Sequence, residues 1–152
     1  LEKFIAMREA EGARLKNDVL TRSGFILENV SRVETLSPET VENYRNRLYQ
    51  KLKEVLESTE VDMQRIVTEA AIFADKVAVD EETVRLRSHI SQLEGLLESD
   101  EAIGRKLDFI VQEMNREVNT IGSKCQDVNI TKIVVEMKSE IEKIREQIQN
   151  IE

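Results

Sequence analysis

The final segment of the sequence carries a strict apolar repeat that limits the chain to a small set of helical folds. Its apolar residues recur at steps of four, three, four, three, four and three positions: Ile130, Val134, Met137, Ile141, Ile144, Ile148 and Ile151. This heptad spacing predicts one amphipathic helix over residues 129–150, about 33 Å long at 1.5 Å per residue. The apolar seam either packs against other helices of the same chain, which is the commoner case, or forms an intermolecular coiled coil.

Apolar spacing of three and four residues continues through the rest of the sequence. Five glycines, one proline and an aromatic content of 4% also disfavour a β-sandwich or a loop-rich fold. Ser37 as N-cap and Pro38 at the first helical position predict a helix start after a short loop. Gly122 predicts a left-handed helix end. The sequence therefore predicts an all-α fold of about six helices, over residues 2–34, 38–57, 62–78, 81–99, 104–121 and 129–150.

These predicted helices group into two units. Residues 1–60 are expected to form a long helical hairpin, because the loop before Ser37 would return the chain antiparallel to its first helix. Residues 61–152 are expected to form a C-terminal helical domain, again as antiparallel hairpins or a bundle. Long helices with short connections carry more apolar surface than one small chain covers, so we also expect a homo-oligomer.

Charge is distributed unevenly along the chain, whose net charge is -8. Residues 1–60 hold 10 Lys/Arg and 11 Asp/Glu, whereas residues 61–152 hold 12 and 19. A protein that binds RNA usually carries a basic surface, which this chain lacks at the whole-molecule level. The sequence contains no run of about 18 apolar residues that would span a membrane. Its lone Cys125 suits a reducing compartment, so we expect a cytoplasmic protein without membrane association.

Side chains with acid–base or metal-binding chemistry lie on two neighbouring predicted helices. His89, the only histidine, either ligates a metal or moves a proton, or is a half-buried histidine at the edge of the core. The next helix carries the carboxylates of Asp108, Glu113 and Glu117. These either hold a divalent cation together with the imidazole or form salt bridges with nearby Arg and Lys, which is the commoner use. Because a short loop joins the two helices, we expect His89 and these carboxylates to converge.

A narrow stripe of polar side chains follows the predicted helix over residues 104–121. Its members recur at steps of four, three and four positions: Asp108, Gln112, Asn115 and Asn119. Asn is a poor helix former, so a row of carboxamides indicates groups that hydrogen-bond a fixed partner. Arg85, Arg116 and Lys124 are candidate phosphate contacts, although a solvated face with ion pairs is the commoner explanation for such residues.

Two stretches of the sequence resemble the signature of the YicC/YloC family of bacterial proteins. In EETVRLRSH the matching residues are Glu82, Arg85, Leu86, Ser88 and His89. In GRKLDFIVQEMNREVNTIGSK they are Gly104, Arg105, Leu107, Asp108, Phe109, Gln112, Glu113, Asn115, Arg116, Glu117, Asn119, Thr120, Ser123 and Lys124. The closing run KSEIEKIREQIQNIE resembles the family's C-terminus, and residues 1–20 resemble its middle region more loosely. Family members carry an additional N-terminal domain to which nothing in this sequence corresponds.

The resemblance implies a metal-dependent endoribonuclease that hydrolyses RNA, with this chain corresponding to the C-terminal part. It implies Mg²⁺ or Mn²⁺ as cofactor, with metal-binding or catalytic roles for His89, Asp108, Glu113 and Glu117. The implied substrate contacts are Arg85, Gln112, Asn115, Arg116, Asn119 and Lys124. The rival hypothesis is a non-catalytic helical module for oligomerisation or adaptor binding, which the heptad helix and the acidic charge balance favour.

Overall fold

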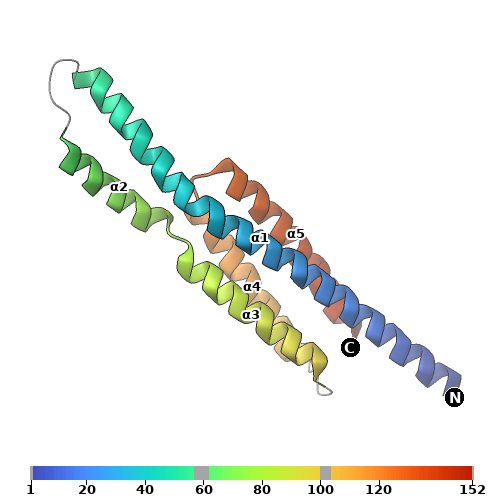
Figure 1. Ribbon diagram of the computed structural model, residues 1–152. Coiled ribbons are helices and arrows are strands. Elements are labelled where there is room, and N and C mark those ends of the chain that lie inside the picture. The colour runs from blue at the N-terminus through green and yellow to red at the C-terminus, as the bar shows by residue number, and fades with distance from the viewer. Residues whose placement is uncertain (1, 57–61, 100–103, 152) are drawn as a thin grey trace.

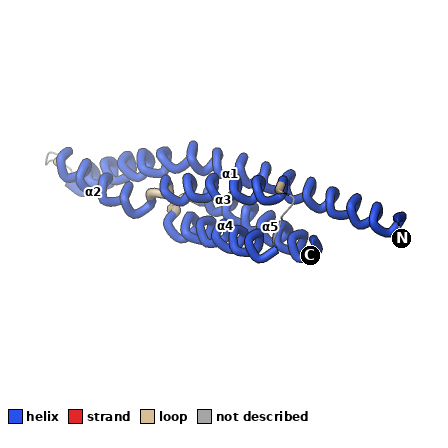
Figure 2. Tube along the Cα trace, turned by 90° about the horizontal axis from the view of Figure 1, so that it is seen from below, coloured by secondary structure: helices blue, strands red, loops and turns tan. Residues whose placement is uncertain are grey.

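Five α-helices make up the computed structural model, which describes residues 2–56, 62–99 and 104–151 (Figures 1 and 2). They are α1 (Glu2–Leu56), α2 (Met63–Val77), α3 (Asp80–Glu98), α4 (Gly104–Lys124) and α5 (Val128–Ile151). The described residues contain no strand, and the predicted all-α fold is confirmed. The domain boundary predicted between residues 60 and 61 lies outside them. No described helix combines the length and the apolar character needed to cross a bilayer.

The helices are arranged along α1, which runs the length of the molecule (Figure 1). α3 and α5 each contact both α1 and α4, so these four helices form a bundle. α2 packs on α1 beyond one end of the bundle, where the rings of Tyr44 and Phe73 stack with centroids 3.9 Å apart. Arg22 Nη1 donates to Glu140 Oε2 across 3.0 Å and joins α1 to α5 at the partly exposed rim.

An apolar core fills the bundle, and the heptad seam of α5 is part of it. The seam residues are each at most 6% exposed: Ile130, Val134, Met137, Ile141, Ile144 and Ile148. They pack with buried residues of α1, α3 and α4, for example Ile26, Leu93 and Met114. Of the two uses open to the heptad pattern, this chain therefore adopts packing against its own helices.

The predicted N-terminal hairpin is wrong, because α1 continues through Pro38 without a turn. Pro38 lacks the N–H that would bond the carbonyl of Glu34, a loss that costs about 3 kcal/mol in a helix interior. Packing on both sides of the proline offsets this cost. Val33 is fully buried, and Thr40 Oγ1 donates to Asp127 Oδ2 across 3.2 Å, just ahead of α5. These tertiary contacts outweigh the local signal for a helix start.

Three of the four shorter helices have a described residue in the N-cap position, and a side chain caps two of these three. Asp62 caps α2 by accepting from the backbone N–H of Gln64 and Arg65. Asp127 caps α5 in the same way, with Oδ1 2.6 Å from the backbone nitrogen of Asn129. α3 differs from both, because Asp80 lies inside its first turn and Val79 in the N-cap position provides no side-chain cap. The acidic first turn still complements the helix dipole.

α4 continues past Gly122 to Lys124, so the predicted left-handed stop at this glycine is also wrong. The glycine instead permits a close approach of two helices. A Cβ at position 122 would lie 3.1 Å from Val134 Cγ1 of α5, which is tighter than ordinary van der Waals contact. The absence of a side chain at Gly122 therefore sets how closely α4 and α5 pack at this level.

Candidate functional site

α4 owes its position to a broad apolar face. Six of its apolar residues are at most 7% exposed: Leu107, Ile110, Val111, Met114, Val118 and Ile121. They pack into the core between α3 and α5, the two helices that α4 contacts most. The opposite side of α4 consequently faces solvent and is free to contact a partner.

The solvent-facing side of α4 is a row of polar residues interrupted by one aromatic ring. We call this row the outward stripe. Its residues all lie within about 40° of one direction at 100° per residue, and all are exposed: Arg105, Phe109, Gln112, Arg116, Asn119 and Ser123. A shallow hollow of about 450 Å³ lies over it, lined by Gln112, Asn115, Arg116, Asn119, Thr120 and Ser123. The structure thus brings together the three carboxamides and Arg116 that the sequence singles out.

The carboxylates of α4 lie outside the outward stripe, and each has an arginine partner. The pairs are Asp108 with Arg145 at 3.7 Å, Glu113 with Arg116 at 3.9 Å, and Glu117 with Arg85 at 2.9 Å. Asp108 Oδ2 also accepts from Gln112 Nε2 across 2.9 Å. In a chain of net charge -8, the outward stripe itself therefore carries two arginines and no acid.

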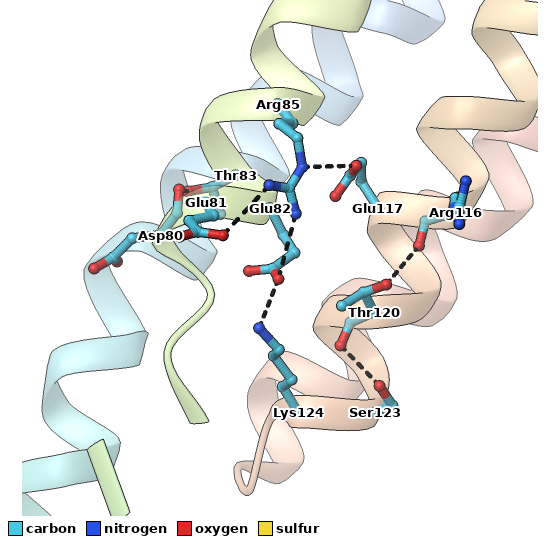
Figure 3. A network of polar contacts seen from close by, with 10 residues as sticks. All are labelled: Asp80, Glu81, Glu82, Thr83, Arg85, Arg116, Glu117, Thr120, Ser123 and Lys124. Carbon is cyan, nitrogen blue, oxygen red and sulfur yellow. Dashed lines mark hydrogen bonds and ion pairs between the residues drawn. The ribbon is translucent and has the colours of Figure 1, made fainter. Parts of the chain in front are cut away.

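A network of charged groups joins α3 to α4 (Figure 3). Lys124 Nζ donates to Glu82 Oε1 across 2.7 Å, and Arg85 Nε donates to Glu117 Oε1 across 2.9 Å. Both carboxylates are buried, with Glu82 2% and Glu117 6% exposed. Burial acts to raise the pKa of Glu82, but the hydrogen bond from Lys124, a backbone hydrogen bond and the nearby charges together hold this pKa below its ordinary value. The hydrogen bond with Glu117 raises the pKa of Arg85.

This network uses three of the side chains that the sequence assigns to substrate or catalysis. Arg85 and Lys124, predicted to contact phosphate, are paired with buried carboxylates of the helix contact. Glu117, a predicted metal ligand, is one of those carboxylates. The second oxygen of Glu82, Oε2, is buried without a hydrogen-bond partner in the part of the chain that the structure describes.

His89 lies on α3 one turn after Arg85 and is half-buried. Its Nδ1 is buried, and no group among the described residues hydrogen-bonds to it. Over residues 2–56, 62–99 and 104–151, no three or more His, Cys, Asp or Glu side chains are grouped so that they could hold a metal ion. The predicted ligands His89, Asp108, Glu113 and Glu117 therefore form no such group among the described residues, and their metal-binding and catalytic roles stay predictions.

Sequence reasoning missed Phe109 as a surface feature. Its ring is 62% exposed in the middle of the outward stripe, one turn after Arg105 and one turn before Gln112. The signal was present in the sequence, since Phe109 falls on the polar side of a helix whose other apolar residues share the opposite side. The pairing of Glu82 with Lys124 was missed for a different reason, because the two residues are 42 positions apart.

The fold and the outward stripe together define a helical-bundle protein with a polar, arginine-containing surface. Residues 33–152 match the family described as "Endoribonuclease YicC-like, C-terminal", and the chain belongs to this family. Over its whole length it is 49% identical to a protein of Clostridioides difficile and 39% identical to one of Haemophilus influenzae. Each is named "Probable endoribonuclease YicC", and the chain spans 52% of the length of each relative, about half. The family resemblance of the sequence is confirmed.

Proposed function

We propose that this chain forms the helical half of an endoribonuclease and that the outward stripe of α4 contacts the RNA. The names of the relatives support the activity. The observation that carries the proposal is the separation of charge on α4. Its three carboxylates all lie off the outward stripe and face arginines, whereas the stripe offers carboxamides, a hydroxyl, Arg105 and Arg116. Phosphate oxygens and base edges both accept hydrogen bonds from such groups.

The proposal divides the remaining candidates into two roles. His89, Asp108 and Glu113 are kept for the chemical step, because imidazole and carboxylate groups transfer protons to and from RNA oxygens. Arg85 and Glu117 are assigned to holding α3 against α4, as is Lys124 through Glu82. Mg²⁺ or Mn²⁺ remains a proposed cofactor, with no ligands assigned to it.

The test uses two arginines in matched surroundings. Arg116 on the outward stripe and Arg14 on α1 have side chains 75% and 73% exposed, and each pairs with a glutamate three residues earlier. RNA binding is measured by fluorescence anisotropy with a protein of the relatives' full length, over a series of KCl concentrations. We expect Arg116→Gln to weaken binding. The negative slope of log K against log salt should become shallower by about 0.7, the value for one lost phosphate contact on a single strand. Arg14→Gln should leave both quantities unchanged.

Cleavage is followed in the same preparation on a gel with end-labelled RNA. Addition of EDTA should stop cleavage, and excess Mg²⁺ or Mn²⁺ should restore it. If Arg116→Gln and Arg14→Gln change the RNA affinity and its salt dependence equally, the outward stripe does not contact the RNA. Cleavage that is undiminished by EDTA would show that the reaction needs no divalent cation, and the RNA contact of α4 would still stand.

A second candidate function is helical assembly, for which the arm formed by α2 and the end of α1 provides the observation. Three apolar side chains there are more than half exposed: Val55, Met63 and Val67. Apolar groups exposed on a two-helix arm suit contact with another copy of the chain, so we also propose that the protein self-associates. Light scattering of wild type and of Val67→Glu tests this, since a strict monomer in both would refute self-association.

A further inference from the structure

Phe109 has surroundings unlike those of an ordinary exposed phenylalanine. It is 62% exposed, whereas the other large apolar residues of α4 are buried in the core. Its neighbours along the outward stripe are Arg105 one turn before it, Gln112 one turn after it and Arg116 two turns after it. Phe109 therefore lies between two arginines, whose positions on the helix are about 16 Å apart at 1.5 Å per residue.

The polar groups around Phe109 have unused hydrogen-bonding capacity. In the part of the chain that the structure describes, neither Arg105 nor Asn119 forms a hydrogen bond or an ion pair. The Gln112 Nε2 donates to Asp108, so Oε1 of the same carboxamide is left to accept a bond. Carboxamides match the donor and acceptor patterns at base edges, and guanidinium groups match phosphates.

An aromatic ring flanked by arginines and carboxamides suits unpaired RNA better than paired RNA. In an A-form duplex the bases are stacked inside the helix, and the major groove is too narrow for side chains to read. A single strand instead exposes the faces and edges of its bases, which stack on aromatic side chains without strong sequence preference. A base on the ring of Phe109 would have a phosphate on each side of it, within reach of Arg105 and Arg116.

We propose that the outward stripe of α4 binds unpaired ribonucleotides, with Phe109 as the stacking platform for a base. This inference rests on the proposed contact between α4 and RNA and specifies the substrate class as single-stranded RNA. Phe109 is here a binding residue and takes no part in proton transfer. Gln112 and Asn119 contact the edges of the bases beside it.

The test compares Phe109 with a second exposed phenylalanine. Phe25 lies on α1 and is 52% exposed, which makes Phe25→Leu the matched control for Phe109→Leu. The probes are a fluorescein-labelled RNA that cannot self-pair and the same RNA annealed to its complement, titrated with the full-length protein. We expect the single strand to bind at least tenfold more tightly than the duplex. Phe109→Leu should weaken single-strand binding about tenfold, as removal of one stacking platform does.

Further measurements on the same protein decide between the alternatives. Phe109→Tyr keeps an aromatic face and should retain binding, and 2-aminopurine fluorescence in the RNA should be quenched by wild type but not by Phe109→Leu. Single-strand binding that is insensitive to Phe109→Leu, or equal binding of duplex, overturns this inference while the RNA contact of α4 still stands. Absence of binding to either RNA overturns the proposed function as well. If Phe109→Leu changes the mass of the protein assembly measured by light scattering but leaves RNA binding unchanged, the outward stripe is a protein interface.

Discussion

Lys124 Nζ lies 2.7 Å from Glu82 Oε1, so the last residue of α4 is bound to the first turn of α3. The carboxylate of this pair is 2% exposed, whereas the lysine side chain is 37% exposed. Among the described residues one other cation is close to Glu82, with Arg85 Nη2 3.6 Å from the same oxygen. The pair therefore compensates a buried negative charge at the point where α3 and α4 meet.

Removal of Lys124 should destabilise the protein more than removal of an exposed lysine. Lys124→Met leaves the buried Glu82 with the weaker contact to Arg85, at an expected cost of about 2 kcal/mol in the free energy of unfolding. Urea unfolding followed by circular dichroism measures this cost. Lys138→Met on the exposed side of α5 is the control and should change the free energy by less than about 0.5 kcal/mol. Equal effects would show that the Glu82 pair adds nothing to stability.

Stability should fall in acid because of the same carboxylate. The pKa of Glu82 is lower in the folded protein than its ordinary value of 4.5. A depressed pKa contributes stability above the ordinary value, and this contribution is lost as the pH falls through the folded-state pKa. The free energy of unfolding, measured from neutral pH down to about pH 3, should therefore decline less steeply in Glu82→Gln than in wild type. Asp75→Asn, at an exposed position of α2, should keep the wild-type slope.

Gly122 and Gly24 should respond differently to alanine. Both glycines lie inside helices, where alanine is favoured by about 1 kcal/mol. A Cβ at Gly24 meets no atom within 4 Å, so Gly24→Ala should gain this full amount. A Cβ at Gly122 meets Val134 Cγ1 at 3.1 Å, so Gly122→Ala should gain little or lose stability through overpacking. Thermal unfolding distinguishes the two variants. An equal gain in stability would show that α5 shifts away from position 122 at no cost in free energy.

Pro38 and Ser37 test the continuity of α1. In one unbroken helix, Pro38→Ala restores a backbone hydrogen bond and should raise the free energy of unfolding by about 1–3 kcal/mol. Ser37→Ala should then be close to neutral. If Ser37 were instead the N-cap of a separate helix, its loss would cost about 1 kcal/mol and Pro38→Ala would bring no gain. Denaturant unfolding of the two variants therefore separates a continuous helix from a hairpin.

His89 should affect cleavage without affecting RNA binding. If its imidazole transfers a proton, His89→Ala in the full-length protein should lower the cleavage rate by about a hundredfold or more. Anisotropy titration with the same RNA should give an unchanged affinity, and circular dichroism should give unchanged helical content. Full cleavage by His89→Ala would show that the imidazole is only a half-buried part of the α3 surface.

Local periodicity was enough to predict most of the architecture. The heptad seam from Ile130 to Ile148 and the 3/4 spacing elsewhere identified the helical segments. Features decided by tertiary contact were not predictable in this way. Pro38 was interpreted as a helix start because the partners of its neighbours, such as Asp127 with Thr40, are 87 positions away in the sequence.

The site was predicted less completely than the fold for the same physical reason. Gln112, Asn115 and Asn119 were found because one helical period brings them together. Lys124 was assigned to phosphate because its actual partner, Glu82, belongs to another helix and is 42 positions away. Sequence spacing within one helix says which residues share a side of that helix, but the ion pairs between helices depend on how the bundle packs.

The continuity of α1 gives the molecule a fixed length scale. A helix of 55 residues is about 82 Å long at 1.5 Å per residue, and only its middle part is clasped by the bundle (Figure 1). Any domains or partners attached at its two ends are therefore separated by the length of the helix. A helical hairpin over residues 1–60 would instead have brought the two ends close together. Because α1 is one continuous helix, its two ends lie on opposite sides of the contact with α3 and α5.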